Sequence, residues 1–406
     1  MLKAKKENNL LLTFQALLLL AAYFCLEPLL SQIYILYSYD IFYVPYSACR
    51  LLLPLIVFML FIFRLIKNRG RVHFGVLGPA FAVYLLYVLA SALNSENLEF
   101  YWLVNLAQVI FIMPVCSNRK IMQNFIRAAT LMYTVLAAIN VLFILFPNLY
   151  SVFGGSYWET FISGWHNMAG FPLIMGMMFA LLNCHYNGSR VLLILYTVLF
   201  VLNEYLLWSA TALVAALPLL LFLSPQVKEL VKKLDFSVFI IIILLLFVLL
   251  VFVWGSLQDS AVLQFITGDV LKKDVTLTGR VNIWKGIWQM IKEKPLLGHG
   301  LSDDPAMYYD PDYNRYWVHA HNLFMQTLYE GGLLTFAAGL SVLFLTAFKL
   351  RKGRDREAAA IFKITLFSML VNYQADQFIV HPWLSGCWAG IFFICNFASE
   401  VAENEC

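Results

Sequence analysis

The sequence predicts an all-α protein, a polytopic transmembrane helical bundle. Of its 406 residues, 61% are hydrophobic and only 13% are charged, and the mean hydropathy is +0.75. Soluble domains carry roughly 25% charged residues. Apolar runs of about 20 residues, which is enough to cross a hydrocarbon core of roughly 30 Å, recur along most of the chain. We therefore expect a protein that crosses a membrane many times.

The apolar runs predict about 12 spans. They are expected at 10–30, 48–66, 73–93, 99–117, 125–147, 164–184, 190–207, 209–224, 235–254, 322–348, 358–374 and 380–398. Only a tight turn around Trp208 and Ser209 separates the seventh run from the eighth. The first run is too long for a signal-peptide core and lacks a small-residue cleavage pattern, so we expect it to be retained.

The basic residues predict the orientation. If the amino terminus is cytoplasmic, most of the 28 Lys and Arg residues lie in inner segments, and the short outer loops contain only Arg50. The positive-inside rule then puts both termini in the cytoplasm. Because the net charge of +4 comes from these inner loops, it indicates anionic lipid headgroups as partners and not nucleic acid.

The pattern divides the chain into three parts. Residues 1–254 hold the first nine expected spans, residues 255–321 form one large extracytoplasmic loop, and residues 322–406 hold the last three spans and a cytoplasmic tail. Long loops translocate largely regardless of charge, so the basic residues of 255–321 do not contradict this topology. We expect the working part of the protein in this loop.

The loop begins its ordered part with TLTGRVNIWKGIWQMIKEKP, which has the apolar period of an amphipathic helix. The apolar face holds Val281, Trp284, Ile287, Trp288 and Ile291. Thr278 is the expected N-cap, and Pro295 closes the segment. Such a helix either lies in the outer membrane interface or caps the bundle.

Two histidine-bearing segments follow this helix. LLGHGLSDDP is a glycine-rich turn, and WVHAHNLFMQTLYEGG runs from polar loop into the next apolar segment. His319, His321 and Asn322 lie at that junction. A polar cluster where a long outer loop gives way to an apolar run is a candidate site.

The order of these segments resembles the O-antigen ligase and O-antigen polymerase superfamily, whose members act on polyprenyl-diphosphate-linked glycans. The segments are GRVNIWKGIW, PLLGHGL and HAHNLFMQTLYEGGLLT. The family's ligase motif is His-Asn (or Ser or Gln), nine residues, Gly, two residues, then Gly, Thr or Tyr. It is matched by His321, Asn322, Gly332 and Thr335.

One feature departs from the family. Its members often carry a Ser-Arg or Thr-Arg pair at the start of the span after the tight outer turn. Here that place reads WSATALVAAL, with Ser209 and Thr211 but no Arg. Arg50, at the outer end of the second span, is a candidate for the missing phosphate-binding cation.

The resemblance implies glycan transfer from a lipid diphosphate, which needs a base for the attacking hydroxyl and a cation for the leaving group. Histidine is the usual base at neutral pH, and the planar guanidinium suits a diphosphate. We predict His321 and Arg280 as catalytic residues. Substrate contacts are expected from Asn322, His319, Arg315, Arg50 and His166. A histidine at a helix start is often only a cap, and Arg315 in YNRYW could equally stack on its aromatic neighbours.

The same part of the sequence also allows a metal site. The HAH sequence lies near Asp303, Asp304, Asp310 and Asp312, which together offer enough ligands for a divalent cation. These acidic residues belong to turn sequences, where Asp before Pro is common, and the resemblance implies catalysis without metal. The 7 cysteines are scattered without paired spacing. We expect neither a metal nor a cofactor.

The expected function is an inverting glycosyltransferase at the outer face of the cytoplasmic membrane. It would polymerise polyprenyl-diphosphate-linked repeat units of a surface polysaccharide, an O-antigen or a capsule. The first alternative is ligation of the finished glycan to a lipid or wall acceptor. The second is a flippase for lipid-linked sugars, which would predict polar residues in several spans. The expected partners are the lipid-linked oligosaccharide and the bilayer, with other polysaccharide-assembly proteins as further candidates.

Overall fold

The computed structural model describes residues 13–23, 40–67, 75–94, 101–146, 148, 170–256, 260–265, 268, 279–301, 308–310, 314–317, 319–375 and 386–404. In order, the helices are Thr13–Tyr23, α3 (Asp40–Lys67), α4 (Leu77–Leu93), α5 (Tyr101–Cys116), α6 (Arg119–Leu145), α8 (Gly170–Asn187), α9 (Arg190–Leu207), α10 (Ala210–Phe222), α11 (Pro225–Lys233), α12 (Phe236–Val248), the π-helical η1 (Leu249–Val253), the 3-10 turn η2 (Trp254–Ser256), α13 (Ala261–Gln264), α14 (Arg280–Glu293), α15 (Leu323–Lys352), α16 (Arg356–Ala375) and α17 (Gly386–Asn404). A short hairpin of β1 (Tyr308–Asp310) and β2 (Arg315–Trp317) is the only sheet within the described ranges.

The structure is an all-α bundle that bears large apolar side chains on its outside, as expected of a multi-pass membrane protein. Inside, aromatic residues pack closely; Tyr23 and Tyr133 share a hydrogen bond of 2.9 Å. Outside, Phe63 is 66% exposed and Ile194 is 64% exposed. In water such faces would be unfavourable, whereas in lipid they are solvated by acyl chains.

By length and composition, four helices among the described residues could cross a membrane. These are α6, α9, the continuous run Phe236–Ser256, and α15. Helices α10 and α11 would form a fifth span together, but the chain bends by 95° between them. The predicted turn at Trp208 and Ser209 is confirmed, since Trp208 has a left-handed φ of 47° and Ser209 caps α10. The number of about 12 spans stays a prediction.

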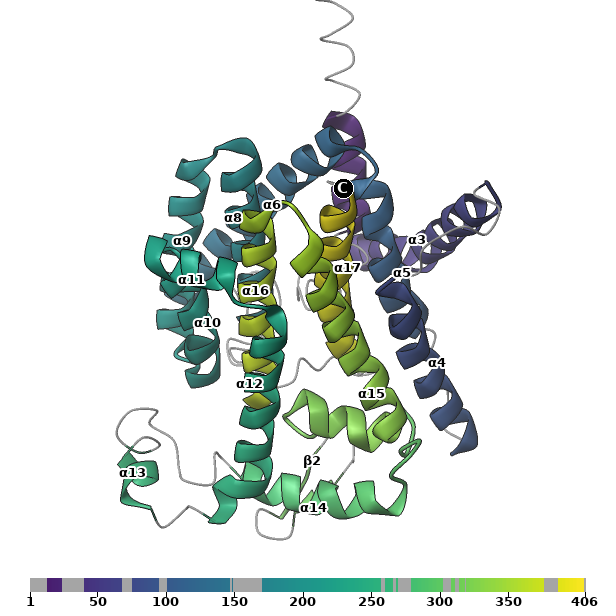
Figure 1. Cartoon of the computed structure of the whole chain (residues 1–406), viewed down its shortest axis with the longest axis vertical. Coiled ribbons are helices and arrows are strands. Elements are labelled where there is room, and N and C mark those ends of the chain that lie inside the picture. The colour runs from purple at the N-terminus through teal and green to yellow at the C-terminus, as the bar shows by residue number, and fades with distance from the viewer. Residues whose placement is uncertain are drawn as a thin grey trace, which may run out of the picture.

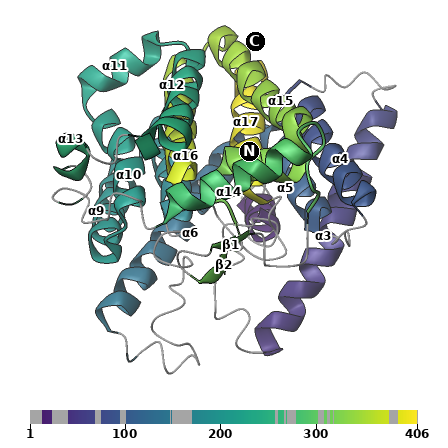
Figure 2. The same ribbon diagram turned by 90° about the horizontal axis from the view of Figure 1, so that it is seen from below.

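The bundle has two distinct ends (Figure 1). Helix α14 lies across one end, while the turn from α15 to α16 and the last residues of α17 lie at the other. Figure 2, which looks at the α14 end, shows the β1–β2 hairpin beside that helix. Within the bundle α15 packs against α4 and α17, and α10 packs against α16.

Helix α15 corrects one expectation. The continuous apolar run 322–348 predicts a single straight span, but the helix is broken at Gly332, whose φ is 65° and ψ is −168°. Figure 1 shows the first segment, 323–331, lying across the end of the bundle next to α14, and the rest running along the bundle. His321 therefore precedes a short transverse helix and not the span itself.

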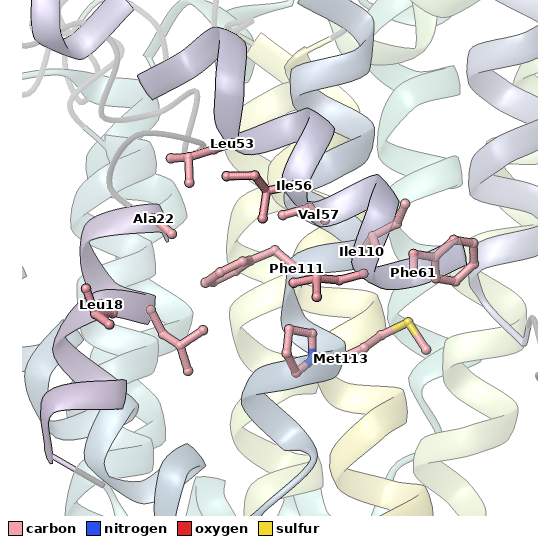
Figure 3. Close-up of a pocket in the computed structure, with 12 residues that line it drawn as sticks. Leu18, Ala22, Leu53, Ile56, Val57, Phe61, Ile110, Phe111 and Met113 are labelled. Carbon is pink, nitrogen blue, oxygen red and sulfur yellow. The ribbon is translucent and has the colours of Figure 1, made fainter. Parts of the chain in front are cut away.

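An apolar cavity of about 420 Å³ lies between the first helix, α3 and α5. Figure 3 shows its 12 lining residues, among them Leu18, Val57 and Phe111. All 12 are apolar, and none belongs to α14 or α15. A sugar or a diphosphate would find no hydrogen-bond partner there, so the cavity is not the site of glycan chemistry.

Candidate active site

Helix α14 forms one wall of the site. Gly279, with a left-handed φ of 84°, precedes its first residue, Arg280, so Gly279 and not the expected Thr278 is the N-cap. The predicted apolar face is buried, including Val281, Trp284 and Ile287. Because α14 packs on α15 and η1, the structure favours the interpretation that this helix caps the bundle over one in which it lies in the membrane interface.

The transverse segment 323–331 forms the opposite wall. Asn322 caps it, because its Oδ1 accepts hydrogen bonds from Phe324 N–H (2.9 Å) and Met325 N–H (3.0 Å). The Asn322 amide Nδ2 donates to the Gln374 carbonyl (2.8 Å) and to Gln374 Oε1 (3.2 Å). Asn322 is fully buried, so the structure gives this motif residue a role in fixing the helix start.

The 295–300 loop supplies hydrogen-bond partners for the backbone groups at the break in α15. In an unbroken helix the N–H groups of residues 333 and 334 would donate to the carbonyls of residues 329 and 330. Four backbone hydrogen bonds with the 295–300 loop replace those two. They are His299 N–H to Tyr329 O (2.8 Å), Gly300 N–H to Glu330 O (2.8 Å), Leu333 N–H to Pro295 O (2.8 Å) and Leu334 N–H to Leu296 O (3.2 Å).

Two motif glycines make this exchange possible. A Cβ on Gly332 would lie 2.3 Å from the carbonyl carbon and oxygen of Leu296, and a Cβ on Gly298 would lie 2.5 Å from the carbonyl carbon of Glu330. Both glycines also have positive φ. The PLLGHG and EGG sequences therefore serve a close backbone approach that holds the 295–300 loop in the helix break.

The histidine loop, residues 319–321, lies between these walls. His319 and His321 have ring centroids only 3.8 Å apart, and His321 N–H donates to His319 Nδ1 at 3.2 Å. His321 has a left-handed φ of 49°. This conformation costs about 1–3 kcal/mol for a residue other than glycine, so the surroundings must hold it.

Arg280 lies close enough to His319 for its charge to affect the pKa of that imidazole. Burial, followed by the charges of His321 and Arg280, holds the pKa of His319 well below 6.5. His319 is therefore neutral at neutral pH. Because its Nδ1 accepts the His321 N–H, the proton of the neutral ring is on Nε2. The structure thus brings together three predicted residues, Arg280, His319 and His321.

The structure also identifies three supporting residues that the sequence pattern did not single out as polar contacts. The indole of Trp284 donates to the Ala320 carbonyl (2.8 Å), and Ala320 N–H donates to Gln326 Oε1 (2.8 Å). Gln326 Nε2 in turn donates to Glu330 Oε1 (2.6 Å). The available signal was a Gln and a Glu one helical turn apart inside an apolar run.

The other predicted residues are placed only in part. Arg315 begins β2 opposite Asp310, and its side chain lies outside the described residues. The same holds for the side chain of Arg50, whose helix α3 packs against α5. His166 lies outside the described residues altogether. For these three residues the assigned role stays a prediction.

The alternative cation site falls mostly outside the described ranges, which leave out Asp303, Asp304 and Asp312. Among the residues that are described, no group of three or more His, Cys, Asp or Glu side chains is arranged to hold a metal ion.

Comparison with known proteins agrees with the motifs. No curated protein matches the chain. Residues 176–340 match a family model described as O-antigen ligase, and this match runs from α8 into the second segment of α15, so it includes both walls of the site and the histidine loop. This match supports the assignment of residues 176–340 to the O-antigen ligase and O-antigen polymerase superfamily.

Proposed function

We propose that this chain is a glycosyltransferase that polymerises polyprenyl-diphosphate-linked repeat units of a surface polysaccharide, with inversion at the anomeric carbon. The observation that carries the proposal is the close pair of His319 and His321 rings, with Arg280 near enough to lower the pKa of His319. A cation next to a pair of imidazoles fits a reaction that needs one proton acceptor and one diphosphate contact.

His321 is the better candidate for the base. His319 Nδ1 already accepts a backbone N–H, so the ring presents only a donor, Nε2–H, to its surroundings. His319 is also buried, whereas His321 is partly exposed. His321 would therefore accept the proton, and His319 would orient it or donate to a sugar oxygen.

The proposed step is a single displacement. The acceptor hydroxyl oxygen forms a bond to the anomeric carbon as its proton passes to His321. The bond from the anomeric carbon to the diphosphate oxygen breaks, and polyprenyl diphosphate leaves with the electron pair. Arg280 stabilises the charge that develops on the leaving group, supported by the N-terminal end of α14, where N–H groups and the helix dipole favour anions.

The test is reconstitution in vesicles with a lipid-diphosphate-linked repeat unit as the only glycan. Polymerisation predicts a ladder of longer lipid-linked chains and release of polyprenyl diphosphate. If purified protein yields neither product, the proposed function is wrong.

Ligation is the second candidate, because the matched family model is described as O-antigen ligase. It shares the donor and the chemistry and differs only in the acceptor. Adding a lipid or wall acceptor to the same vesicles separates the two activities. Glycan on the added acceptor, with no ladder in its absence, would favour ligation.

We also propose that the α14 end of the bundle faces outward and that residues 255–321 form the working extracytoplasmic part. The basic residues of the α15–α16 turn at the opposite end support this orientation. Single cysteines replacing the exposed residues Lys285 and Arg351, in a chain without its native cysteines, test it in intact cells. An impermeant reagent should label position 285 and not position 351.

A further inference from the structure

The peptide unit of Ala320, between the two histidines, is fixed on both sides. Its carbonyl accepts the indole N–H of Trp284, and its N–H donates to Gln326 Oε1, both at 2.8 Å. Trp284 is 1% exposed and Gln326 is 3% exposed, so water does not compete for these bonds. A buried peptide that is bonded at both polar atoms has one orientation.

The Gln326 amide is itself prevented from flipping. Its Nε2 donates to Glu330 Oε1 at 2.6 Å, which leaves Oε1 to face the Ala320 N–H. A flipped amide would place two donors or two acceptors together and leave buried groups unpaired, at a cost of about 1–3 kcal/mol. Glu330 is anchored in turn, because its carbonyl accepts Gly300 N–H from the 295–300 loop.

We propose that Trp284, Gln326 and Glu330 form a positioning clamp that sets the pose of His321 relative to Arg280. The proposal rests on the proposed function of His321 as the base. Trp284 follows Arg280 by four residues and so lies on the same face of α14. One helix turn therefore carries both the diphosphate contact and the indole that holds the histidine loop. The clamp also keeps His321 in its left-handed conformation at φ 49°.

Three variants and one control test the clamp in the full-length protein. Gln326→Met keeps the side-chain length but removes the amide, Trp284→Phe removes the indole N–H, and Glu330→Gln keeps an acceptor oxygen. Trp388→Phe is the matched control. Trp388 is also fully buried, and its indole donates at 2.9 Å to Thr327 Oγ1 on the same transverse segment and not to the Ala320 peptide.

Two measurements test whether the clamp positions His321. Steady-state transfer gives kcat and the donor KM, and the rate of carbethoxylation of His321, followed by mass spectrometry without any substrate, gives its reactivity. Gln326→Met and Trp284→Phe should lower kcat about 10- to 100-fold while donor KM stays within about twofold, since a misplaced base costs rate and not binding. Both should also alter the His321 modification rate severalfold. Glu330→Gln should keep kcat within about threefold of the wild type, and Trp388→Phe should lower only the Tm.

Equal losses of kcat in Trp284→Phe and Trp388→Phe would overturn the clamp, as would an unchanged His321 modification rate in Gln326→Met. The two proposals fail separately. If wild-type protein transfers no glycan, the function is wrong, whereas the substrate-free modification rates still decide whether the clamp holds His321.

Discussion

Replacement of Gly332 by alanine probes the helix break on which the site depends. At φ 65° and ψ −168° Gly332 occupies a region that is essentially restricted to glycine, and another residue there costs about 1–3 kcal/mol. The added Cβ would also lie 2.3 Å from the backbone of Leu296, so the 295–300 loop must move away. Bonds of 2.8–3.2 Å would then lengthen, and each lost backbone bond costs about 1 kcal/mol.

The expected destabilisation is therefore about 3–6 kcal/mol, a large part of the stability of a typical domain. Gly188→Ala is the control. Gly188 has a similar φ of 68°, but an added Cβ would meet no atom within 4 Å, so only a backbone cost of about 1–2 kcal/mol remains. Thermal unfolding in detergent should give a Tm for Gly332→Ala lower than that of Gly188→Ala by about 2–5 °C. Equal Tm values would refute the close backbone approach as the reason for this glycine.

Three further predictions concern the site and the opposite end of the bundle. His321→Ala should reduce polymer formation about 10²- to 10⁴-fold in folded, membrane-inserted protein, and His319→Ala should reduce it less; His321→Ala turnover close to the wild type would rule out this base. Arg280→Lys should lose most of its activity although the charge is kept, because Lys lacks the two-pronged contact to a diphosphate; activity near the wild type would reduce Arg280 to a general electrostatic role. Burial alone would raise the pKa of Asp355, but hydrogen bonds from His185 and the backbone outweigh it and lower the pKa to about 2. A carboxyl group whose pKa is depressed in the folded state contributes stability above its unfolded pKa of about 3.9 and loses it as the pH falls through the folded value. The Tm deficit of Asp355→Asn should therefore be present at pH 7 and shrink as the pH falls from about 4 towards 2; a pH-independent deficit would contradict the stabilisation of the Asp355 carboxylate by its hydrogen bonds.

The sequence predicted the helices well where apolar runs have clear ends. Helix α9 has the expected bounds because Arg190 follows a turn and Trp208 begins the next one. The break at Gly332 was not predictable, because the apolar run is continuous and the hydrogen bonds that stabilise the break come from residues about 35 positions earlier. Local patterns carry no information about such distant partners.

The site likewise combines features that local sequence predicts with features that depend on distant residues. The motif singled out His321 and Asn322. The sequence alone did not show that the Asn322 side chain caps the helix through its Oδ1 and donates to Gln374 through its Nδ2. Trp284 was predicted on the apolar face of its helix, and its ring is indeed buried. The pattern did not predict that its indole N–H donates a hydrogen bond to the Ala320 carbonyl. Periodicity reports which side of a helix is buried, and the individual partners of buried polar atoms appear only in three dimensions.

The anchored ends of the segment between Gly300 and His319 have a consequence for engineering. One end is tied by Gly300 N–H to Glu330, and by Leu301 N–H to Ser91 at 2.8 Å; the other is tied through Ala320 to Trp284 and Gln326. Both ends of this stretch are therefore fixed, and its β1–β2 hairpin packs beside α14. A swap of residues 302–318 for the corresponding stretch of a relative should therefore leave the hydrogen bonds of Gly300, Leu301 and Ala320 in place.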